Sequence, residues 1–321
     1  MSENLAGRTL GDRYDVLELI GVGGMGAVYR ARDRELDELV ALKVIREELA
    51  QVAHIVERFR SEVKLARRVT HQNVARTFEL GNADGILFCT MELLDGESLT
   101  ARLKRERKLH TADAVAIAIA VCDGLAAAHA RDVIHRDIKP DNVLLASDGR
   151  IVVADFGVAS AALTDIHDPS GTPAYMAPEQ AKGDPPTPAV DVYAIGIVLH
   201  EMLTGRRAFQ GTVAKILDDK AQLDRVAAAQ NEMPVELAEI IGRATAREPA
   251  HRIQTAGQLR QALEPYGKPA RTSVATTPRE LQPSDITTVF VIAPTGLGTP
   301  RFYLAEAVHE EVVARLGRIP R

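Results

Sequence analysis

The sequence predicts an α+β fold with two lobes, a small β-rich lobe followed by a larger helical lobe. Residues 14–46 alternate apolar and polar positions around a Gly-rich turn, and strand-like runs return over 74–93. Helical periodicity dominates from residue 111 onward, over 112–130, 189–204, 212–220, 234–247 and 255–264. The pattern changes near 91–97, which we interpret as the junction between the lobes.

Shorter signals complete this outline. A basic amphipathic helix is expected over 52–69, and Thr111 is expected to cap the Ala-rich helix 112–130, whose composition suits a buried position. Two short strands, 142–145 and 150–154, flank the turn at Asp148-Gly149.

Composition excludes several classes of protein. With 46% hydrophobic and 26% charged residues the chain is globular, and a net charge of -5 with no Trp disfavours nucleic acid as a partner. Cys89 and Cys122 lie in apolar stretches, as buried cysteines in a reducing compartment do. No signal peptide and no apolar run of about 20 residues is present, so we expect a cytoplasmic chain without a membrane segment.

The end of the chain differs from the rest. Residues 267–287 are rich in Pro, Ser and Thr without periodicity, which predicts a flexible linker. Residues 288–321 contain one strand-like run and one amphipathic helix, too little to bury a core. We therefore expect the start of a second, truncated βα domain.

A glycine-rich string, GVGGMGAV at 21–28, is the first chemical signal. Phosphate groups need close backbone N–H groups, and a Cβ at Gly21, Gly23 or Gly26 would obstruct that approach. Such strings are often ordinary turns, but this one lies between two strands, which favours a phosphate-covering hairpin over a dinucleotide-binding turn. Lys43 follows on the third strand, and Glu62 on the helix could hold the Lys43 ammonium. Either residue alone would be interpreted as an ordinary surface charge.

The strings HRDIKPDN at 135–142 and ADFG at 154–157 are far more specific. With them, residues 10–266 resemble a bacterial Hanks-type, or eukaryotic-like, Ser/Thr protein kinase, with a first lobe at about 10–93 and a second at about 97–266. The resemblance implies the protein kinase fold, ATP as substrate and Mg²⁺ as cofactor. It implies Asp137 as the base for the substrate hydroxyl, and Asn142 and Asp155 as the metal ligands.

The resemblance assigns further roles. Lys139 is expected to steady the γ-phosphate, and Thr172 to orient Asp137 and Lys139. The adenine is expected to lie in an apolar slot with backbone contacts at its edge, although the same residue types fill ordinary cores. The residues implied for this slot are Ile20, Val28, Ala41, Leu144, the gatekeeper Met91, Glu92 and Leu93.

Other family positions are structural. Glu179, in APE at 177–179, is expected to pair with Arg252, and Asp191 is expected to anchor the catalytic-loop backbone. His135 is expected to pack beneath Phe156 and not to act as a base.

The activation segment departs from the family pattern. It spans 25 residues, from Asp155 to Glu179, and lacks the Thr pair often found at its middle. Thr164 and Ser170 remain as candidate phosphoacceptors, and Arg136 before the base is the arrangement tied to control by phosphorylation.

These features predict a Ser/Thr protein kinase of bacterial signalling, with protein substrates and self-association for autophosphorylation in trans. One alternative is a silent nucleotide-binding pseudokinase, although Lys43, Asp137, Asn142 and Asp155 are all present. A small-molecule phosphotransferase is another, disfavoured by the APE segment, Lys139 and Thr172, which the resemblance implies build a peptide-docking surface. The tail, above all FYLAEAVHEEVVARLGRIP, resembles the start of a TolB amino-terminal-like domain, or is a generic amphipathic helix.

Overall fold

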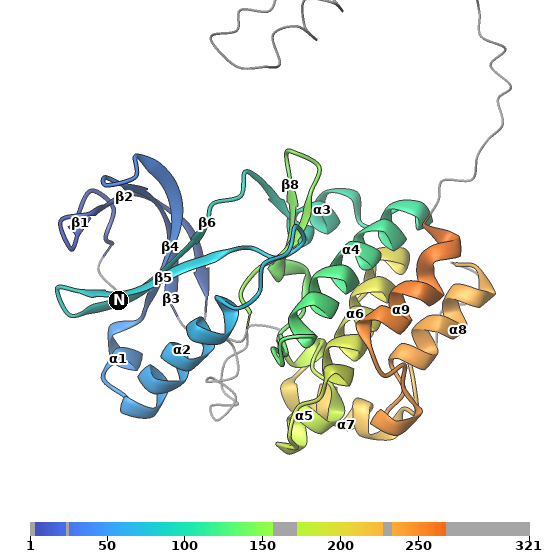
Figure 1. Ribbon diagram of the computed structural model, residues 1–321. Coiled ribbons are helices and arrows are strands. Elements are labelled where there is room, and N and C mark those ends of the chain that lie inside the picture. Colours follow the sequence, from blue (N-terminus) through green and yellow to red (C-terminus); the bar gives the residue numbers. More distant parts are fainter. Residues whose placement is uncertain (1–3, 24–25, 157–171, 227–232, 268–321) are drawn as a thin grey trace, which may run out of the picture. The chain divides into compact units, whose positions relative to one another are not determined.

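The computed structural model describes residues 4–23, 26–156, 172–226 and 233–267 (Figure 1). The chain divides into two units, Met1–Pro269 and Ala270–Arg321, and every element described here belongs to the first. Apart from Gly267, the expected linker and the expected TolB-like domain lie outside the described residues.

The amino-terminal lobe is built on an antiparallel sheet with the strand order β1-β2-β3-β4-β6-β5. Alternating apolar side chains such as Tyr14 and Val16 point into a core on one face. The strands are β1 (Thr9–Leu10), β2 (Tyr14–Gly23), β3 (Gly26–Asp33), β4 (Glu38–Ile45), β5 (Thr77–Ala83) and β6 (Ile86–Glu92).

The hairpin of β2 and β3 carries the glycine-rich string, and its three predicted glycines have different surroundings. A Cβ on Gly23 would have no heavy atom within 4 Å, and one on Gly21 would only reach Val28 at 4.0 Å. A Cβ on Gly26 would lie 1.8 Å from the backbone oxygen of Val44 on β4. Gly26 is therefore required by the close approach of β3 to β4, a reason separate from the phosphate contact expected from the sequence.

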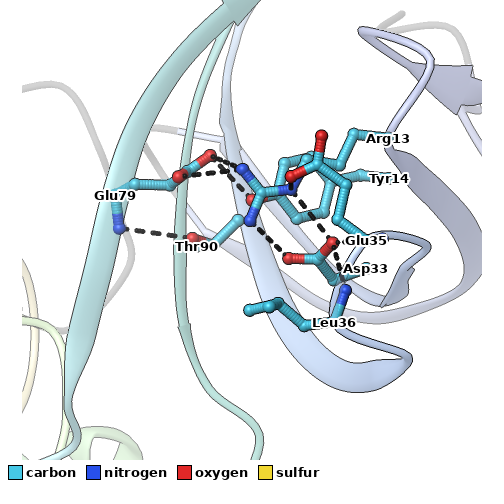
Figure 2. A network of polar contacts seen from close by, with 7 residues as sticks. All are labelled: Arg13, Tyr14, Asp33, Glu35, Leu36, Glu79 and Thr90. Carbon is cyan, nitrogen blue, oxygen red and sulfur yellow. Dashed lines mark hydrogen bonds and ion pairs between the residues drawn. The ribbon is translucent and has the colours of Figure 1, made fainter.

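A polar cluster links residues of four strands, β2, β3, β5 and β6, at one end of this sheet (Figure 2). Arg13 donates to both carboxylate oxygens of Asp33, at 3.0 and 2.6 Å, and its other nitrogen reaches Glu79 on β5 at 3.3 Å. Tyr14 donates to Glu79 at 2.7 Å, and the backbone N–H of Glu79 donates to Thr90 at 3.3 Å. The cluster fixes β5 against the β2–β3 hairpin.

Two helices follow β4, the short α1 (Glu47–Ala50) and α2 (Ala53–Ala66). Phe59 and Val63 on α2 pack with Ile45, Leu87 and Cys89 of the sheet in a second apolar cluster. The basic helix expected at 52–69 is thus confirmed as α2, with its apolar stripe against the sheet and its basic side chains outward.

A second, three-stranded antiparallel sheet begins the larger lobe, in the order β7 (Gly96–Ser98), β8 (Val143–Ala146) and β9 (Ile151–Val153). The lobe is otherwise helical, as the sequence predicts, although the sequence patterns did not predict β7 and α3. Its α-helices are α3 (Leu99–Glu106), α4 (Thr111–His129), α5 (Pro178–Lys182), α6 (Pro188–Thr204), α7 (Val213–Gln222), α8 (Val235–Ala244) and α9 (Ala256–Leu263). Short 3-10 helices are η1 (Pro140–Asn142), η3 (Thr172–Ala174), η4 (Pro249–His251) and η5 (Glu264–Tyr266).

Helix α4 lies at the centre of this lobe and packs against α6 and α9. Among the described helices only α4 is long and apolar enough to cross a bilayer, but its apolar side chains, including Val121 and Leu125, belong to the main core. One detail of the expectation was wrong. Thr111 is the first helical residue, and the N-cap position before it is occupied by His110. The His110 side chain makes no capping hydrogen bond.

The difference between two glycines gives a test of the hairpin. We expect Gly26→Ala to lower the thermal midpoint by several degrees, because its Cβ must displace the backbone of Val44. Gly23→Ala, whose Cβ meets open space, is the matched control and should leave the midpoint within about one degree. Thermal unfolding followed by circular dichroism measures both, and equal midpoints would contradict the packing argument.

Candidate active site

The loop that precedes η1 is anchored by one buried carboxylate, that of Asp191 on α6, which is fully buried. Its Oδ2 accepts the backbone N–H of His135 at 2.9 Å and its Oδ1 that of Arg136 at 2.8 Å. His129, at the end of α4, lies 2.8 Å from Oδ2. Arg136 has a φ of +69°, so the loop makes a tight turn that these bonds hold.

Asp137 projects from this loop into a small polar cluster. Its Oδ2 accepts from Nζ of Lys139 at 2.8 Å and from Nδ2 of Asn142 at 3.1 Å. The same Asn142 nitrogen donates to the backbone oxygen of Asp137 at 2.8 Å, which closes the loop on itself. Three of the residues named from the sequence therefore meet through direct hydrogen bonds.

The end of β9 lies beside this cluster. The N–H of Ala154 donates to the backbone oxygen of Asn142 at 2.9 Å, so Asp155 follows directly next to Asn142. His135 contacts the backbone oxygen of Ala154 at 2.9 Å, and its ring lies 4.6 Å from that of Phe156. His135 is buried and holds the two segments together, as expected.

Lys43 forms the link from the sheet to this cluster. Its Nζ lies 2.8 Å from Oδ1 of Asp155, and the lysine is buried. Burial opposes the charge on both groups, but their attraction outweighs it, so the pKa of Asp155 is lowered and the pKa of Lys43 is raised. The pair is ionised at neutral pH.

Glu62 does not pair with Lys43, which contradicts the ion pair expected from the sequence. Its Oε1 accepts from Nε of Arg58, one turn earlier on α2, at 3.3 Å, while its buried Oε2 has no hydrogen-bond partner among the described residues. Burial raises the pKa of Glu62 to about 7, against the opposing charges of Arg58, Arg136 and Lys43. The physical reason is that Asp155 already neutralises Lys43 at contact distance.

The residues implied for the adenine slot lie on neighbouring strands. Ala41 on β4 is paired with Met91 on β6, and Val28 on β3 is paired with Lys43. Ile20 on β2 is 47% exposed. The remaining members are Leu144 on β8, and Glu92 and Leu93 at and after the end of β6.

One backbone group in this slot is already used. The N–H of Glu92 donates to the backbone oxygen of Arg76 at 2.8 Å, and its carboxylate is paired with Arg150 at 2.9 Å. A purine contact at Glu92 would therefore have to use its carbonyl oxygen, a distinction that the sequence does not make.

Two residues of α5 make contacts on the helical side of the site. Glu179 and Arg252 form the expected pair, with two bonds of 2.6 and 2.9 Å, and the arginine side chain is completely buried. Gln180, which the sequence patterns did not single out, donates to the backbone oxygen of Arg136 at 3.0 Å. The side chain of Thr172 and the positions of Thr164 and Ser170 lie outside the described residues.

The comparison with known proteins decides the family. The family model described as "Protein kinase domain" matches residues 14–264. The chain belongs to the protein kinase family. The predicted kinase fold is confirmed as well, because the crystal structure of the Mycobacterium tuberculosis PknI kinase domain matches with a TM-score of 0.67 at 27% identity, over 83% of this chain and 100% of that chain.

Curated relatives of the kinase domain are bacterial Ser/Thr protein kinases, as the resemblance predicted. PrkC of Bacillus subtilis is 37% identical over 262 residues, covering 79% of this chain and 40% of PrkC. PknA of Mycobacterium tuberculosis is 33% identical over 292 residues, covering 87% of this chain and 68% of PknA. The chain spans about two fifths of the length of PrkC and of two similar relatives.

The environment of Glu62 predicts a dependence of stability on pH. The folded pKa of about 7 lies above the ordinary value of 4.5, so the ionised form is disfavoured by folding, and this group lowers stability as pH rises from about 4.5 to about 7. Glu62→Gln removes the titration. We expect the thermal midpoint of the variant, relative to wild type, to be a few degrees higher at pH 8 than at pH 5.

The control for this measurement is Glu57→Gln on the same helix, whose side chain is 74% exposed and pairs with Arg60. Its midpoint relative to wild type should be the same at both pH values. A constant difference for Glu62→Gln as well would contradict the assigned environment.

Proposed function

We propose that this kinase domain is an active Ser/Thr protein kinase that transfers the γ-phosphoryl group of ATP to protein hydroxyls. The observation that carries the proposal is the contact of Asp137 with both Lys139 and Asn142, beside the Lys43–Asp155 pair. Phosphoryl transfer requires a base for the acceptor, cations for the phosphates and oxygen ligands for a metal. This cluster contains all three kinds of group.

Asp137 is proposed as the base. Both of its side-chain contacts use Oδ2, so Oδ1 is the oxygen that can accept the proton from a substrate hydroxyl. Lys139 and Asn142 hold the carboxylate in one orientation, and Lys139 places a positive charge beside the transferring group. Positioning of this kind supplies much of the catalysis in phosphoryl transfer.

Asn142 and Asp155 fit the role of holding Mg²⁺. The nitrogen of Asn142 is engaged with Asp137, which leaves its amide oxygen as a ligand, and the Ala154–Asn142 backbone bond places Asp155 next to it. No cluster of three or more His, Cys, Asp or Glu suited to a metal occurs among the described residues. Two protein oxygens suit Mg²⁺, which completes its coordination with water and nucleotide phosphates. When bound, the metal neutralises charge on those phosphates.

Lys43 is proposed to contact the ATP phosphates, under the hairpin that carries Gly21 and Gly23. Open space around these two glycines leaves their backbone accessible to a phosphate. Glu62, with an unpartnered buried oxygen near Lys43, is the group available to hold the ammonium when Asp155 does not. Ile20, Val28, Ala41, Met91, Leu93, Leu144 and the carbonyl of Glu92 are proposed to bind the adenine.

We also propose the wider organisation predicted above. Protein substrates, autophosphorylation in trans through self-association, a cytoplasmic location and bacterial signalling are the expected context. The proposed layout is a kinase domain at 10–266, a linker at 267–287 and the start of a TolB-like domain at 288–321.

Limited proteolysis tests the layout. We expect the first cleavage within 267–287, and a first cleavage inside 10–266 would contradict the layout.

A second candidate, the nucleotide-binding pseudokinase, is favoured by one observation, the pairing of Lys43 with Asp155 in place of Glu62. The activity of the purified chain separates the two. Incorporation of labelled phosphate from ATP into protein supports the kinase, whereas ATP binding without transfer supports the pseudokinase.

Replacement of the base tests the mechanism. Asp137→Asn should reduce phosphoryl transfer by about 10²-fold or more while ATP affinity stays nearly the same, because the base acts on the acceptor hydroxyl. Transfer is measured with labelled ATP, and affinity by calorimetry. Asp84→Asn, in the exposed β5–β6 turn, is the control and should behave as wild type. Wild-type transfer by Asp137→Asn would refute the assignment.

The activation segment gives a regulatory prediction. The Nε of Arg136 is buried without a hydrogen-bond partner among the described residues, which leaves it available to a phosphate. A phosphate on Thr164 or Ser170 would add a charge of about -1.5 to -2. The double variant Thr164→Ala with Ser170→Ala should therefore be less active and gain nothing on preincubation with ATP. Equal activity after preincubation would eliminate this switch.

A further inference from the structure

Lys220, on α7, is a buried lysine that the proposed chemistry does not use. It is only 2% exposed, although it lies on a helix whose other lysine, Lys215, reaches solvent. Its Nζ donates to three backbone oxygens, those of Pro173 at 2.8 Å, Ala174 at 2.9 Å and Met176 at 2.6 Å. A single side chain thus satisfies three carbonyl groups of the segment that precedes α5.

Three accepting oxygens favour the charged form of the lysine. An ammonium has three N–H donors, one for each oxygen, whereas a neutral amine would turn its lone pair toward one of them. The rings of Phe209 and Tyr193, at 4.7 and 5.3 Å, add cation–π attraction. Burial lowers the pKa of Lys220 to about 7, and the charge of Glu179 opposes this decrease. A buried charge of this kind is costly unless its hydrogen bonds are complete.

The segment that Lys220 holds is also connected to the catalytic loop. Ala174, Tyr175, Met176 and Ala177 are buried, and α5 follows directly. From α5, Gln180 donates to the backbone oxygen of Arg136, the residue before Asp137. Residues 173–180 therefore run between the ammonium on α7 and the backbone beside the proposed base.

We propose that Lys220 is a positioning residue for the protein substrate. It holds the carbonyl oxygens of Pro173, Ala174 and Met176, so that this segment, which adjoins the expected peptide-docking surface, keeps its distance from Asp137. The inference rests on the proposed kinase activity and extends it, because it assigns the acceptor side of the reaction to Lys220. The contacts of Lys220 among the described residues include neither the proposed ATP-binding residues nor the cluster around Asp137. Loss of Lys220 should raise the KM for the protein acceptor more than the KM for ATP.

The test uses the full chain with dephosphorylated casein as acceptor. Lys220→Met keeps the length and apolar stem but removes all three donors, and should raise the KM for casein about tenfold or more while the KM for ATP changes less than about twofold. Lys220→Gln, with two N–H donors, should fall between Lys220→Met and wild type. Lys215→Met, the exposed residue on the same helix, should leave both constants unchanged.

Several outcomes would overturn the inference. An unchanged casein KM in Lys220→Met, or equal loss on the ATP and casein sides, would show a purely structural role. If Lys220→Met does not fold, Lys220→Gln tests the inference through the same two constants. Hydrogen exchange supplies an independent measure, since the amides of 174–176 should exchange faster in Lys220→Gln than in Lys215→Met. Failure of the wild type to phosphorylate casein or itself would instead refute the proposed kinase activity.

Discussion

The buried carboxylate of Asp191 is the constraint on which the rest of the site depends. It accepts two successive backbone N–H groups, of His135 and Arg136, in the middle of the larger lobe. The positive φ of Arg136 costs on the order of 1–3 kcal/mol for a residue with a Cβ. Hydrogen bonds to a charged group contribute about 1.5–3 kcal/mol each, so one side chain offsets the strain. Without Asp191, the N–H groups of His135 and Arg136 would lose their hydrogen-bond acceptor, and the loop would no longer orient the Asp137 side chain.

The charges on the opposite side of the site compete for one ammonium. Lys43 lies near two carboxylates, those of Asp155 and Glu62, and forms a contact pair with Asp155. The pKa of Asp155 is lowered because the attraction of Lys43 outweighs burial, whereas burial raises the pKa of Glu62 to about 7. Arg58 at 3.3 Å compensates Glu62 only in part, because its buried Oε2 has no partner among the described residues. The phosphate side of the site therefore contains a carboxylate close to a change of protonation state.

The sequence predicts the parts of this site that are local. The cluster of Asp137, Lys139 and Asn142 lies within one short loop and could be named from the resemblance of HRDIKPDN to a kinase motif, whereas the lobes follow from periodicity. The partner of Lys43 could not be predicted, since it depends on how close α2 and the end of β9 come to β4. The role of Lys220 could not be predicted for a similar reason, because a lysine on a helix is ordinarily a surface residue and only packing reveals its burial.

The two sides of the site are supported differently. Arg136 is held at its N–H by Asp191 and at its carbonyl by Gln180, whose neighbour Glu179 is fixed by the buried Arg252. The backbone before the base is thus restrained from α6 and from α5, both in the helical lobe. The backbone of Val153 at the end of β9 bonds to Asn73 and Ala75 before β5, but the Asp155 side chain is linked to the sheet by one ion pair, with Lys43. Several buried hydrogen bonds restrain the backbone before the base to one conformation, whereas an ion pair such as Lys43–Asp155 can exchange one partner for another. The backbone beside the proposed base is accordingly restrained at more points than the Asp155 side chain on the nucleotide side.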